Sequence, residues 1–455
     1  MDLVAALHEI VGDEARVSTS PSVLEQHGGD LSYHAPRLPD VVVFPASTEE
    51  VGAVLRFANG HRVPVTAFGA GSSLEGHVIP VRGGISLDLM RMDRILDFRP
   101  ADFTVVVQPG VMRGKLNEHV NPEGLFFPVD PGADASLGGM AATNASGTMT
   151  VRYGAMRAQV LGLEVVLADG TAIRTGGRAA KSSAGYDLTG LFVGSEGTLG
   201  VITELTLRLR GLPEHTLAAR AVFPSLEAAC RAAVALIGAG ISVTRVELLD
   251  EATLHAVNRY KGTDYAEAPT LFIELAGTQA GVEADLELTR AVAGEEGCVA
   301  LEHERRPEAR HRLWEARHHA ALAIMAAAPG KRLLTTDVCV PVSQLPDAVH
   351  HARLALDERG LDAAIIGHVG DGNYHVGFMV DPASTEEVAA AREMNELIVE
   401  DALVRGGTCT GEHGVGLGKI RHLEREHGDA LPLMRGLKRL ADPKGILNPG
   451  KVFEP

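Results

Sequence analysis

Short apolar runs, rich in β-branched residues, alternate with glycine-rich turns from residue 41 to residue 211. Runs of about four to eight such residues, bounded by turns, predict strands. The predicted strands are Val41–Phe44, Val63–Thr66, Thr104–Val107, Leu163–Leu167 and Val201–Leu209. Between the first two strands, the spacing of apolar residues predicts a helix over Thr48–Asn59. Ser47 precedes it, and acidic residues follow in its first turn. This pattern is typical of an α+β domain with many loops.

The pattern changes near residue 213, after which the helical runs become longer. We expect helices over residues 225–239, 281–294, 305–328 and 384–405, and strands over Ala218–Phe223, Thr270–Leu275 and His375–Val380. A glycine-rich turn returns at about residue 406 and is followed by a helical stretch and a tail. The chain therefore divides into segments 1–35 (helical), 36–213, 214–410 and 411–455.

Composition narrows the functional class. A chain of 455 residues is too long for one hydrophobic core, so we expect roughly two or three domains. The net charge of −17 argues against a nucleic-acid partner. The four cysteines form neither a C-x-x-C pair nor an iron–sulfur spacing, so we expect reduced thiols.

The N-terminal residues 1–17 read as an acidic amphipathic helix, without the basic and apolar regions of a signal peptide or the Arg/Ser-rich character of a transit peptide. No apolar run is long enough to span a bilayer. From these features we expect a cytoplasmic protein.

Three loops consist almost entirely of small residues. The first covers residues 68–76 and follows a predicted strand, the second covers residues 128–147, and the third covers residues 193–202. Small residues leave backbone N–H groups accessible to a diphosphate or to a flat ligand. The first loop alone could equally be an ordinary glycine turn, because it lacks the third glycine of a dinucleotide fingerprint.

Two histidines, His368 and His375, flank a glycine turn and can converge on one point. A carboxylate from a second glycine-framed turn, Gly407–Gly416, would complete a set of two histidines and one carboxylate. Such a set suits a divalent metal with open positions for a substrate. Ordinary surface or core histidines are the alternative, because the chain has 19 of them.

At the three small-residue loops the chain resembles the FAD-binding oxidoreductases of the vanillyl-alcohol oxidase / p-cresol methylhydroxylase family. The resemblance implies an α+β fold, with a two-subdomain FAD-binding domain over residues 36–213. It also implies an α+β cap domain with an antiparallel sheet over residues 214–410 and a C-terminal segment that returns to the flavin site. The phosphate loop lacks the His or Cys of covalently flavinylated members, so we expect non-covalent FAD. The implied FAD contacts are Gly69, Ala70, Gly71, Ser72, Ser73, Pro131, Gly132, Ser136, Gly138, Gly139, Thr143, Ser146, Gly147, Glu196, Gly197, Ile202 and Asn448.

Nearly the whole chain is similar to one branch of this family, which holds cytochrome-type D-lactate dehydrogenases, D-2-hydroxyglutarate dehydrogenases and the glycolate oxidase flavin subunit. The similarity rests on residues 127–136, 152–157, 336–343 and 442–451. In this branch two histidines and a glutamate bind a divalent cation, and the histidine after the glutamate is the catalytic base. Here these residues are His368, His375, Glu412 and the base His413. We expect Zn²⁺ or Mn²⁺.

Arg317 lies three residues after Trp314 in a predicted helix. An arginine in such a place is more often an exposed helix residue. The Trp-x-x-Arg pattern of the branch implies instead that Arg317 binds the substrate carboxylate, which a guanidinium can do with two parallel hydrogen bonds.

The chain departs from the hydroxyglutarate-type relatives at two positions. Those relatives have a lysine two residues before the aspartate of the Asp-Val-Cys-Val-Pro stretch, where this chain has Thr335. They also have an asparagine two residues after the second metal histidine, where this chain has Gly377. Lys331 and Arg332 lie further back. Both departures favour a substrate with a single carboxylate.

We therefore expect FAD- and metal-dependent oxidation of a D-2-hydroxy acid, with D-lactate favoured over D-2-hydroxyglutarate and glycolate. The electron acceptor stays open between cytochrome c, a quinone and an electron-transfer flavoprotein. A homodimer is expected, and peripheral membrane association stays open. A metal-dependent hydrolase would leave the small-residue loops unexplained, and a non-catalytic subunit would leave the His, Glu and Arg set unexplained.

Overall fold

The computed structural model describes residues 2–453, so Met1 and residues 454–455 of the predicted terminal segments lie outside the described part of the chain. The chain divides into two compact units. The first unit comprises Met1–Ser146, Gly154–Leu212 and Glu412–Pro455, and the second comprises Gly147–Tyr153 and Pro213–Gly411.

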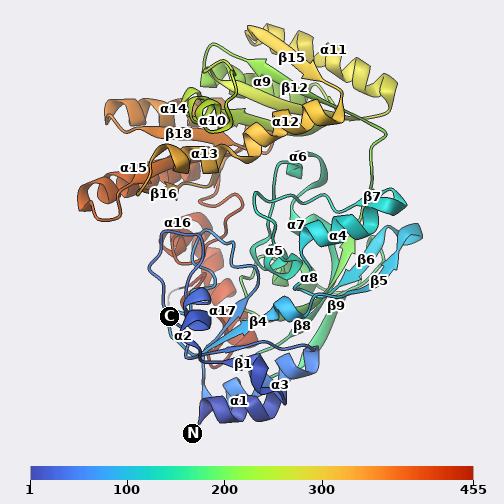
Figure 1. Cartoon of the computed structure of the whole chain (residues 1–455), viewed down its shortest axis with the longest axis vertical. Coiled ribbons are helices and arrows are strands. Elements are labelled where there is room, and N and C mark those ends of the chain that lie inside the picture. Colours follow the sequence, from blue (N-terminus) through green and yellow to red (C-terminus); the bar gives the residue numbers. More distant parts are fainter. Residues whose placement is uncertain (1, 454–455) are drawn as a thin grey trace. The chain divides into compact units, whose positions relative to one another are not determined.

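The first unit contains short helices and three sheets (Figure 1). Its helices are α1 (Leu3–Val11), α2 (Pro21–Gln26), α3 (Thr48–His61), α4 (Arg113–Val120), α5 (Leu137–Thr143), α7 (Met156–Gln159), α8 (Leu188–Phe192), α16 (Leu423–His427) and α17 (Leu431–Ala441). Its strands are β1 (Val17–Ser18), β2 (Val41–Val43), β3 (Val65–Phe68), β4 (Ile85–Asp88), β5 (Ile95–Arg99), β6 (Thr104–Val107), β7 (Leu125–Phe126), β8 (Val160–Val166), β9 (Ala172–Gly176), β10 (Val201–Arg208) and β11 (Arg210–Gly211).

A four-stranded sheet in the order β1-β2-β4-β3 carries the first loop. β2 and β3 both run parallel to β4, and all residues of β2 and β4 are buried, as expected for strands covered on both faces. α3 packs Val51, Val54, Leu55 and Ala58 into this core. Its N-cap is Ser47, whose Oγ accepts a hydrogen bond from the N–H of Glu50 (3.3 Å).

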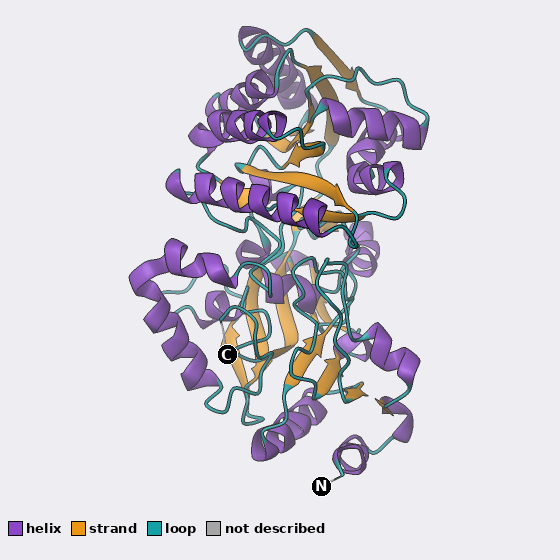
Figure 2. Ribbon diagram, turned by 90° about the vertical axis from the view of Figure 1, so that its left-hand side faces the viewer, coloured by secondary structure: helices purple, strands orange, loops and turns teal. Residues whose placement is uncertain are grey.

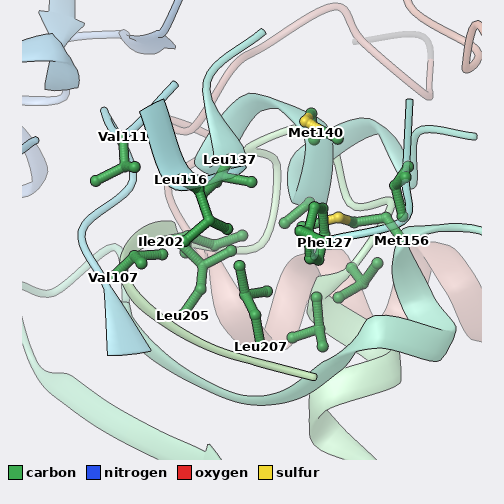
Figure 3. Close-up of a cluster of buried hydrophobic side chains, with 14 of the residues drawn as sticks. Val107, Val111, Leu116, Phe127, Leu137, Met140, Met156, Ile202, Leu205 and Leu207 are labelled. Carbon is green, nitrogen blue, oxygen red and sulfur yellow. The ribbon is translucent and has the colours of Figure 1, made fainter. Parts of the chain in front are cut away.

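A five-stranded antiparallel sheet, in the order β5-β6-β10-β8-β9, supports the second and third loops. A continuous hydrophobic cluster covers it, in which Leu116, Phe127 and Met156 pack with Leu205 and Leu207 of β10 (Figure 3). Burial of such large side chains fixes the ends of the strands, and hence the loops that follow them.

The second unit is an antiparallel sheet with helices packed along it (Figure 2). Its helices are α6 (Thr150–Tyr153), α9 (Leu226–Gly238), α10 (Glu251–Lys261), α11 (Gln279–Glu295), α12 (Pro307–His318), α13 (Ala320–Ala327), α14 (Leu345–Glu358) and α15 (Thr385–Val404). Its strands are β12 (His215–Val222), β13 (Val243–Leu249), β14 (Thr270–Gly277), β15 (Ala300–Glu304), β16 (Arg332–Thr335), β17 (Val338–Cys339), β18 (Ala363–Gly367) and β19 (Asn373–Val380).

The strand order of the second unit is β15-β12-β14-β13-β18-β19-β16, and β17 pairs with β19. The expected α+β class and the antiparallel sheet are confirmed. One expectation is wrong: residues 305–328 form two helices, α12 and α13, instead of one. The break is at His319, whose backbone N–H and ring Nδ1 both bond to the carbonyl of Glu315 (3.0 and 2.8 Å) and close the end of α12.

Candidate functional site

The first two small-residue loops touch each other in the first unit. The first loop begins at Gly69, directly after β3. A Cβ placed on Gly69 would lie 2.5 Å from Oγ of Ser136, which precedes α5 in the second loop. Gly71 has a φ of +67°, which favours glycine, and a Cβ there would strike the ring of Phe68. Close packing therefore favours glycine at both positions.

The third loop and the C-terminal tail join the same cluster. The N–H groups of Gly194 and Glu196 donate to the carbonyls of Ala141 (2.9 Å) and Ala142 (2.8 Å). Nδ2 of Asn448 donates to the carbonyl of Glu196 (2.7 Å). The three loops and Asn448, which are far apart in sequence, thus form one continuous surface in the first unit.

This surface fits FAD. The Oγ of Ser136 is buried and has no hydrogen-bond partner among the described residues, as expected of a hydroxyl placed to bind a ligand. A Cβ on Gly132 would meet nothing within 4 Å, so space is open in front of this backbone. An unpartnered donor beside open backbone is the arrangement that a diphosphate requires.

The structure assigns other contacts to several of the predicted FAD residues. Gly138 is needed for packing, because a Cβ there would lie 2.4 Å from Cβ of Pro109. The side chain of Ile202 is in the hydrophobic cluster, so only its backbone could face a ligand (Figure 3). Oγ of Ser73 donates to Asp30 (2.7 Å), and Oγ1 of Thr143 donates to the carbonyl of Gly139 (3.2 Å).

The remaining predicted contacts lie in the same loops, and all but one of them belong to the first unit. Gly147 belongs to the second unit, where its N–H donates to Oγ1 of Thr150 (3.0 Å). The others, in loops of the first unit, are Ala70, Ser72, Pro131 and Gly197.

The carboxylate of Glu196 holds the C-terminal glycine loop, by which we mean residues 412–416. It accepts hydrogen bonds from the N–H groups of Val415 (2.7 Å) and Gly416 (2.9 Å), and it lies 3.3 Å from Nε2 of His77. Burial alone would raise the pKa of Glu196, but His77 and the two N–H groups outweigh it and lower that pKa. Burial likewise opposes the charge on His77, but Glu196 raises the pKa of His77 overall.

Glu412 and His413 stand at the start of this loop. Oγ of Ser146 donates to Oε2 of Glu412 (2.7 Å), so the hydroxyl of a predicted FAD contact orients a predicted metal ligand. Nε2 of His413 lies 3.7 Å from Oε1 of Glu412. Both side chains are largely buried, with 15% and 12% of their surface exposed, which leaves a small accessible face.

In the second unit the hairpin of β18 and β19 brings the two predicted metal histidines together. His368 follows β18, His375 lies in β19, and their ring centroids are 5.7 Å apart with the rings perpendicular. The tight turn between them needs Gly372, because its φ is +82° and a Cβ there would lie 2.1 Å from the carbonyl of Val340.

Hydrogen bonds determine which ring nitrogen of each histidine can bind a metal. Nδ1 of His375 lies 3.1 Å from the carbonyl of Thr336, and Nδ1 of His368 lies 2.8 Å from Oε1 of Glu247. Carbonyl and carboxylate oxygens only accept, so both Nδ1 atoms carry a proton and any metal must bind through Nε2. Metal-bound histidines are usually held in this way, so the donor set fits a divalent cation.

Arg317 lies on α12 and bonds to the same Glu247. Its Nε and Nη2 both lie 2.8 Å from Oε2 of Glu247, and the side chains of both residues are almost fully buried. This edge of the guanidinium is thus already used. Any further hydrogen bond of this guanidinium must therefore come from Nη1 or from the outer side of Nη2. Sequence reasoning missed Glu247, although an acidic residue in the otherwise apolar end of β13 was a usable signal.

Asp337 is a second residue that sequence reasoning did not assign. It is fully buried, accepts hydrogen bonds from Thr410 (2.7 Å) and Asn373 (3.0 Å), and lies 3.8 Å from Nδ1 of His375. Its carbonyl accepts from the N–H of Gly411 (3.0 Å). Gly411 is followed in the chain by Glu412, and their Cα atoms are about 3.8 Å apart.

Thr335 and Gly377, the two positions that depart from the hydroxyglutarate-type pattern, are direct cross-strand partners in the pairing of β16 with β19. Lys331 does not replace the missing lysine, because its Nζ forms an exposed ion pair with Glu387 (2.8 Å). The two departures therefore lie side by side on the sheet, and neither side chain is a cation or an amide.

Comparison with known proteins identifies the family. Residues 39–176 match the family described as FAD binding domain, and residues 212–452 match the family described as FAD linked oxidases, C-terminal domain. The chain is 47% identical to a probable mitochondrial D-lactate dehydrogenase of Danio rerio, covering 99% of this chain and 92% of the relative. It is 42% identical to the mitochondrial D-lactate dehydrogenase [cytochrome] of Arabidopsis thaliana, covering 100% of this chain and 80% of the relative.

A solved structure agrees on the fold. The crystal structure of p-cresol methylhydroxylase with substrate bound superimposes with a TM-score of 0.82 at 19% identity, covering 99% of this chain and 96% of the other. At this identity the likeness shows the fold alone, and it confirms the expected vanillyl-alcohol oxidase / p-cresol methylhydroxylase architecture.

The expected cytoplasmic location is wrong by these comparisons, because both relatives are named as mitochondrial proteins. The N-terminal segment on which that expectation rested is an element of the first unit: α1 contacts α3 and buries Leu7 and Val11. Its acidic composition therefore reflects a solvated helix face and carries no information on targeting. Within residues 2–453, no helix has the length and apolar character needed to cross a membrane.

Two matching domains and near-complete alignment with these relatives lead to one conclusion. The chain belongs to the FAD-linked oxidases, in the branch of the cytochrome-type D-lactate dehydrogenases, and it is an enzyme that oxidises hydroxy acids with FAD.

Proposed function

We propose that this enzyme oxidises a D-2-hydroxy acid with a single carboxylate, D-lactate in the first place, to the 2-oxo acid. The observation that carries the substrate class is the cross-strand pair of Thr335 and Gly377. A second carboxylate would need a cation or an amide at these positions, and Lys331, which precedes Thr335 in sequence, is bound to Glu387 at the surface. The names of the two relatives support D-lactate over glycolate.

The chain's own residues take distinct roles in this reaction. Arg317 binds the substrate carboxylate through its Nη1 and outer Nη2 hydrogens, and Glu247 holds the guanidinium in place. His413 removes the proton of the 2-hydroxyl group, a role that suits an imidazole near neutral pH. Non-covalent FAD, when bound, supplies the two-electron acceptor for the hydrogen on the substrate's Cα.

A divalent cation, Zn²⁺ or Mn²⁺, is proposed at His368, His375 and Glu412. When bound, it would supply a Lewis acid for the substrate oxygens. The ring orientations support this proposal, since both Nδ1 atoms are held by acceptors. Within the second unit, the buried carboxylate of Asp337 lies 3.8 Å from Nδ1 of His375, close to the proposed histidine ligands.

The electrons must then leave the flavin. The chain has no iron–sulfur cysteine spacing, so we propose a separate carrier: cytochrome c, a quinone or an electron-transfer flavoprotein. Cytochrome c is favoured by the name of the Arabidopsis relative. We retain the homodimer and peripheral membrane association as further parts of the proposal.

Anaerobic flavin bleaching tests the substrate. The purified FAD enzyme is mixed with D-lactate, L-lactate, glycolate or D-2-hydroxyglutarate, and the loss of flavin absorbance is followed. D-lactate should bleach the flavin fastest. The double variant Thr335→Lys/Gly377→Asn should shift the ratio of kcat/KM towards D-2-hydroxyglutarate by roughly tenfold or more, the value of one new charged hydrogen bond.

Lys331→Ala is the matched control, because it removes a nearby lysine that the proposal leaves out, and its ratio should equal that of the wild type. Preference of the wild type for D-2-hydroxyglutarate would overturn the single-carboxylate proposal. A larger effect of Lys331→Ala than of the double variant would show that the distal end of the substrate lies elsewhere.

A further inference from the structure

One buried carboxylate connects two parts of the proposed site. Glu247, in β13, has 1% of its side-chain surface exposed. Its Oε2 accepts both hydrogen bonds from Arg317, 70 residues further along, and its Oε1 accepts from His368, 121 residues further along. Each oxygen thus serves one partner, and no other group of the described chain shares this carboxylate.

We propose that Glu247 is a positioning residue, which at the same time fixes the metal-binding tautomer of His368 and the orientation of the substrate-binding edge of Arg317. This inference rests on the proposed function, and it adds a residue that neither the sequence motifs nor the comparisons assign.

The effect on His368 follows from proton placement. A carboxylate accepts and never donates, so Nδ1 of His368 keeps its proton and Nε2 keeps its lone pair. A carboxylate behind a metal-bound histidine also makes the ring a stronger ligand, and removing such a partner typically weakens metal binding roughly 10–100-fold.

The effect on Arg317 follows from geometry. With Nε and one side of Nη2 bound to Oε2, the guanidinium plane cannot rotate, and its remaining hydrogens point in one direction. A planar fork held in this way loses little entropy when a carboxylate binds. The negative charge of Glu247 also compensates a cation that would otherwise be buried alone.

Glu247→Gln is the decisive substitution because glutamine has one acceptor and one donor group. If its Oε1 turns to Arg317, the amide N–H₂ faces Nδ1 of His368 and drives the proton to Nε2. If Oε1 turns to His368, the N–H₂ faces the guanidinium. One of the two partners must lose its hydrogen-bond acceptor, whereas the size and shape of the side chain stay the same.

The experiment measures Zn²⁺ and Mn²⁺ affinity by competition with a chelator on metal-depleted protein, together with FAD content and KM for D-lactate. Glu247→Gln should bind the metal at least tenfold more weakly, raise KM and keep its FAD, since the FAD loops belong to the first unit. The matched control is Glu274→Gln, which disrupts a largely buried ion pair with Arg245 (3.1 Å) in the same sheet. It should leave the metal affinity unchanged.

A double variant guards against simple misfolding. In Glu247→Gln/Arg317→Met no cation competes for the amide oxygen, so the glutamine can accept from His368. Metal affinity should return towards the wild-type value, while KM stays high. A merely structural role would predict a further loss of metal instead.

The outcomes separate the inference from the proposed function. Wild-type metal affinity together with wild-type KM in Glu247→Gln, or no recovery of metal affinity in the double variant, overturns the positioning role. A wild-type protein that D-lactate bleaches but that takes up neither metal also overturns it, and leaves hydroxy-acid oxidation standing. Glu247-dependent metal binding in a protein that no 2-hydroxy acid bleaches supports the inference and overturns the proposed substrate.

Discussion

The loop that carries Glu412 and His413 depends on Gly416, and Gly416→Ala tests how tightly that loop is held. Gly416 has a φ of +49°, and a Cβ on it would lie 2.1 Å from the carbonyl oxygen and 2.7 Å from Cβ of Glu75. The N–H of Gly416 donates to Glu196, and that of Leu417 donates to the carbonyl of Glu75 (2.8 Å). An alanine cannot be accommodated without moving one of these backbones.

Two unfavourable terms determine how much Gly416→Ala lowers the free energy of unfolding. Placing alanine at positive φ costs about 1–2 kcal/mol. Forcing a methyl group against a fixed backbone typically costs a further ~1–3 kcal/mol, because backbone cannot swing away as a side chain can. The free energy of unfolding should therefore fall by about 2–5 kcal/mol. Turnover should also fall, because a shift of about 1 Å in a catalytic group can cost about 100-fold.

Urea unfolding, followed by ellipticity, and steady-state turnover of D-lactate measure the two effects. Gly124→Ala is the matched control: its φ is +70°, and a Cβ there would meet nothing within 4 Å. It should lose only the conformational part, about 1–2 kcal/mol, and keep full turnover. Equal losses in the two variants would refute the close contact between Gly416 and Glu75, and full turnover in Gly416→Ala would refute the link between loop position and catalysis.

Two further predictions concern single side chains. Ser136→Ala should weaken FAD binding about fivefold, one hydrogen bond of ~1 kcal/mol, without lowering the stability of the FAD-free protein, because Oγ of Ser136 has no protein partner. Ser225→Ala, which removes the N-cap of α9, should lower the stability in urea unfolding but leave FAD binding unchanged in titration. Unchanged FAD binding in Ser136→Ala, or equal losses of FAD binding in both variants, would contradict the FAD assignment. Burial raises the pKa of Asp250 to about 6 in spite of hydrogen bonds from Thr253 and Ile365. The stabilising contribution of the protonated form is therefore complete below about pH 3.9 and is lost as the pH rises through about 6. Wild-type stability relative to Asp250→Asn should fall by about 3 kcal/mol across that window, and a flat or rising difference would disprove the shift.

Local pattern predicted the elements that have local causes. The strand expected at Thr104–Val107 is β6 with the same bounds, and the helix expected from Thr48 is α3. Turn chemistry predicted the convergence of His368 and His375, because a hairpin with Gly372 at positive φ has little conformational choice. In these cases the determining residues lie within about ten positions of one another.

Contacts between distant residues were beyond such reasoning. Ser146 and Glu412 are 266 residues apart in sequence, and Glu247 and His368 are 121 apart. Periodicity describes which face of an element is buried but not which other element covers it. The hydrogen bond of Ser146 to Glu412 was therefore not predicted, although its FAD contact stays a prediction, and Glu247 was not predicted at all.

The pairing of residues 446–448 with β3 has a consequence for synthesis. The N–H of Val65 donates to the carbonyl of Ile446, and the N–H of Asn448 donates back to the carbonyl of Val65, both at 2.8 Å. Until these residues leave the ribosome, the outer edge of β3 has no backbone partner there, and an open apolar edge invites pairing with other chains. The first small-residue loop begins directly after β3. Until residues 446–448 have been synthesised, the strand edge that precedes this loop should therefore be prone to pair with other chains.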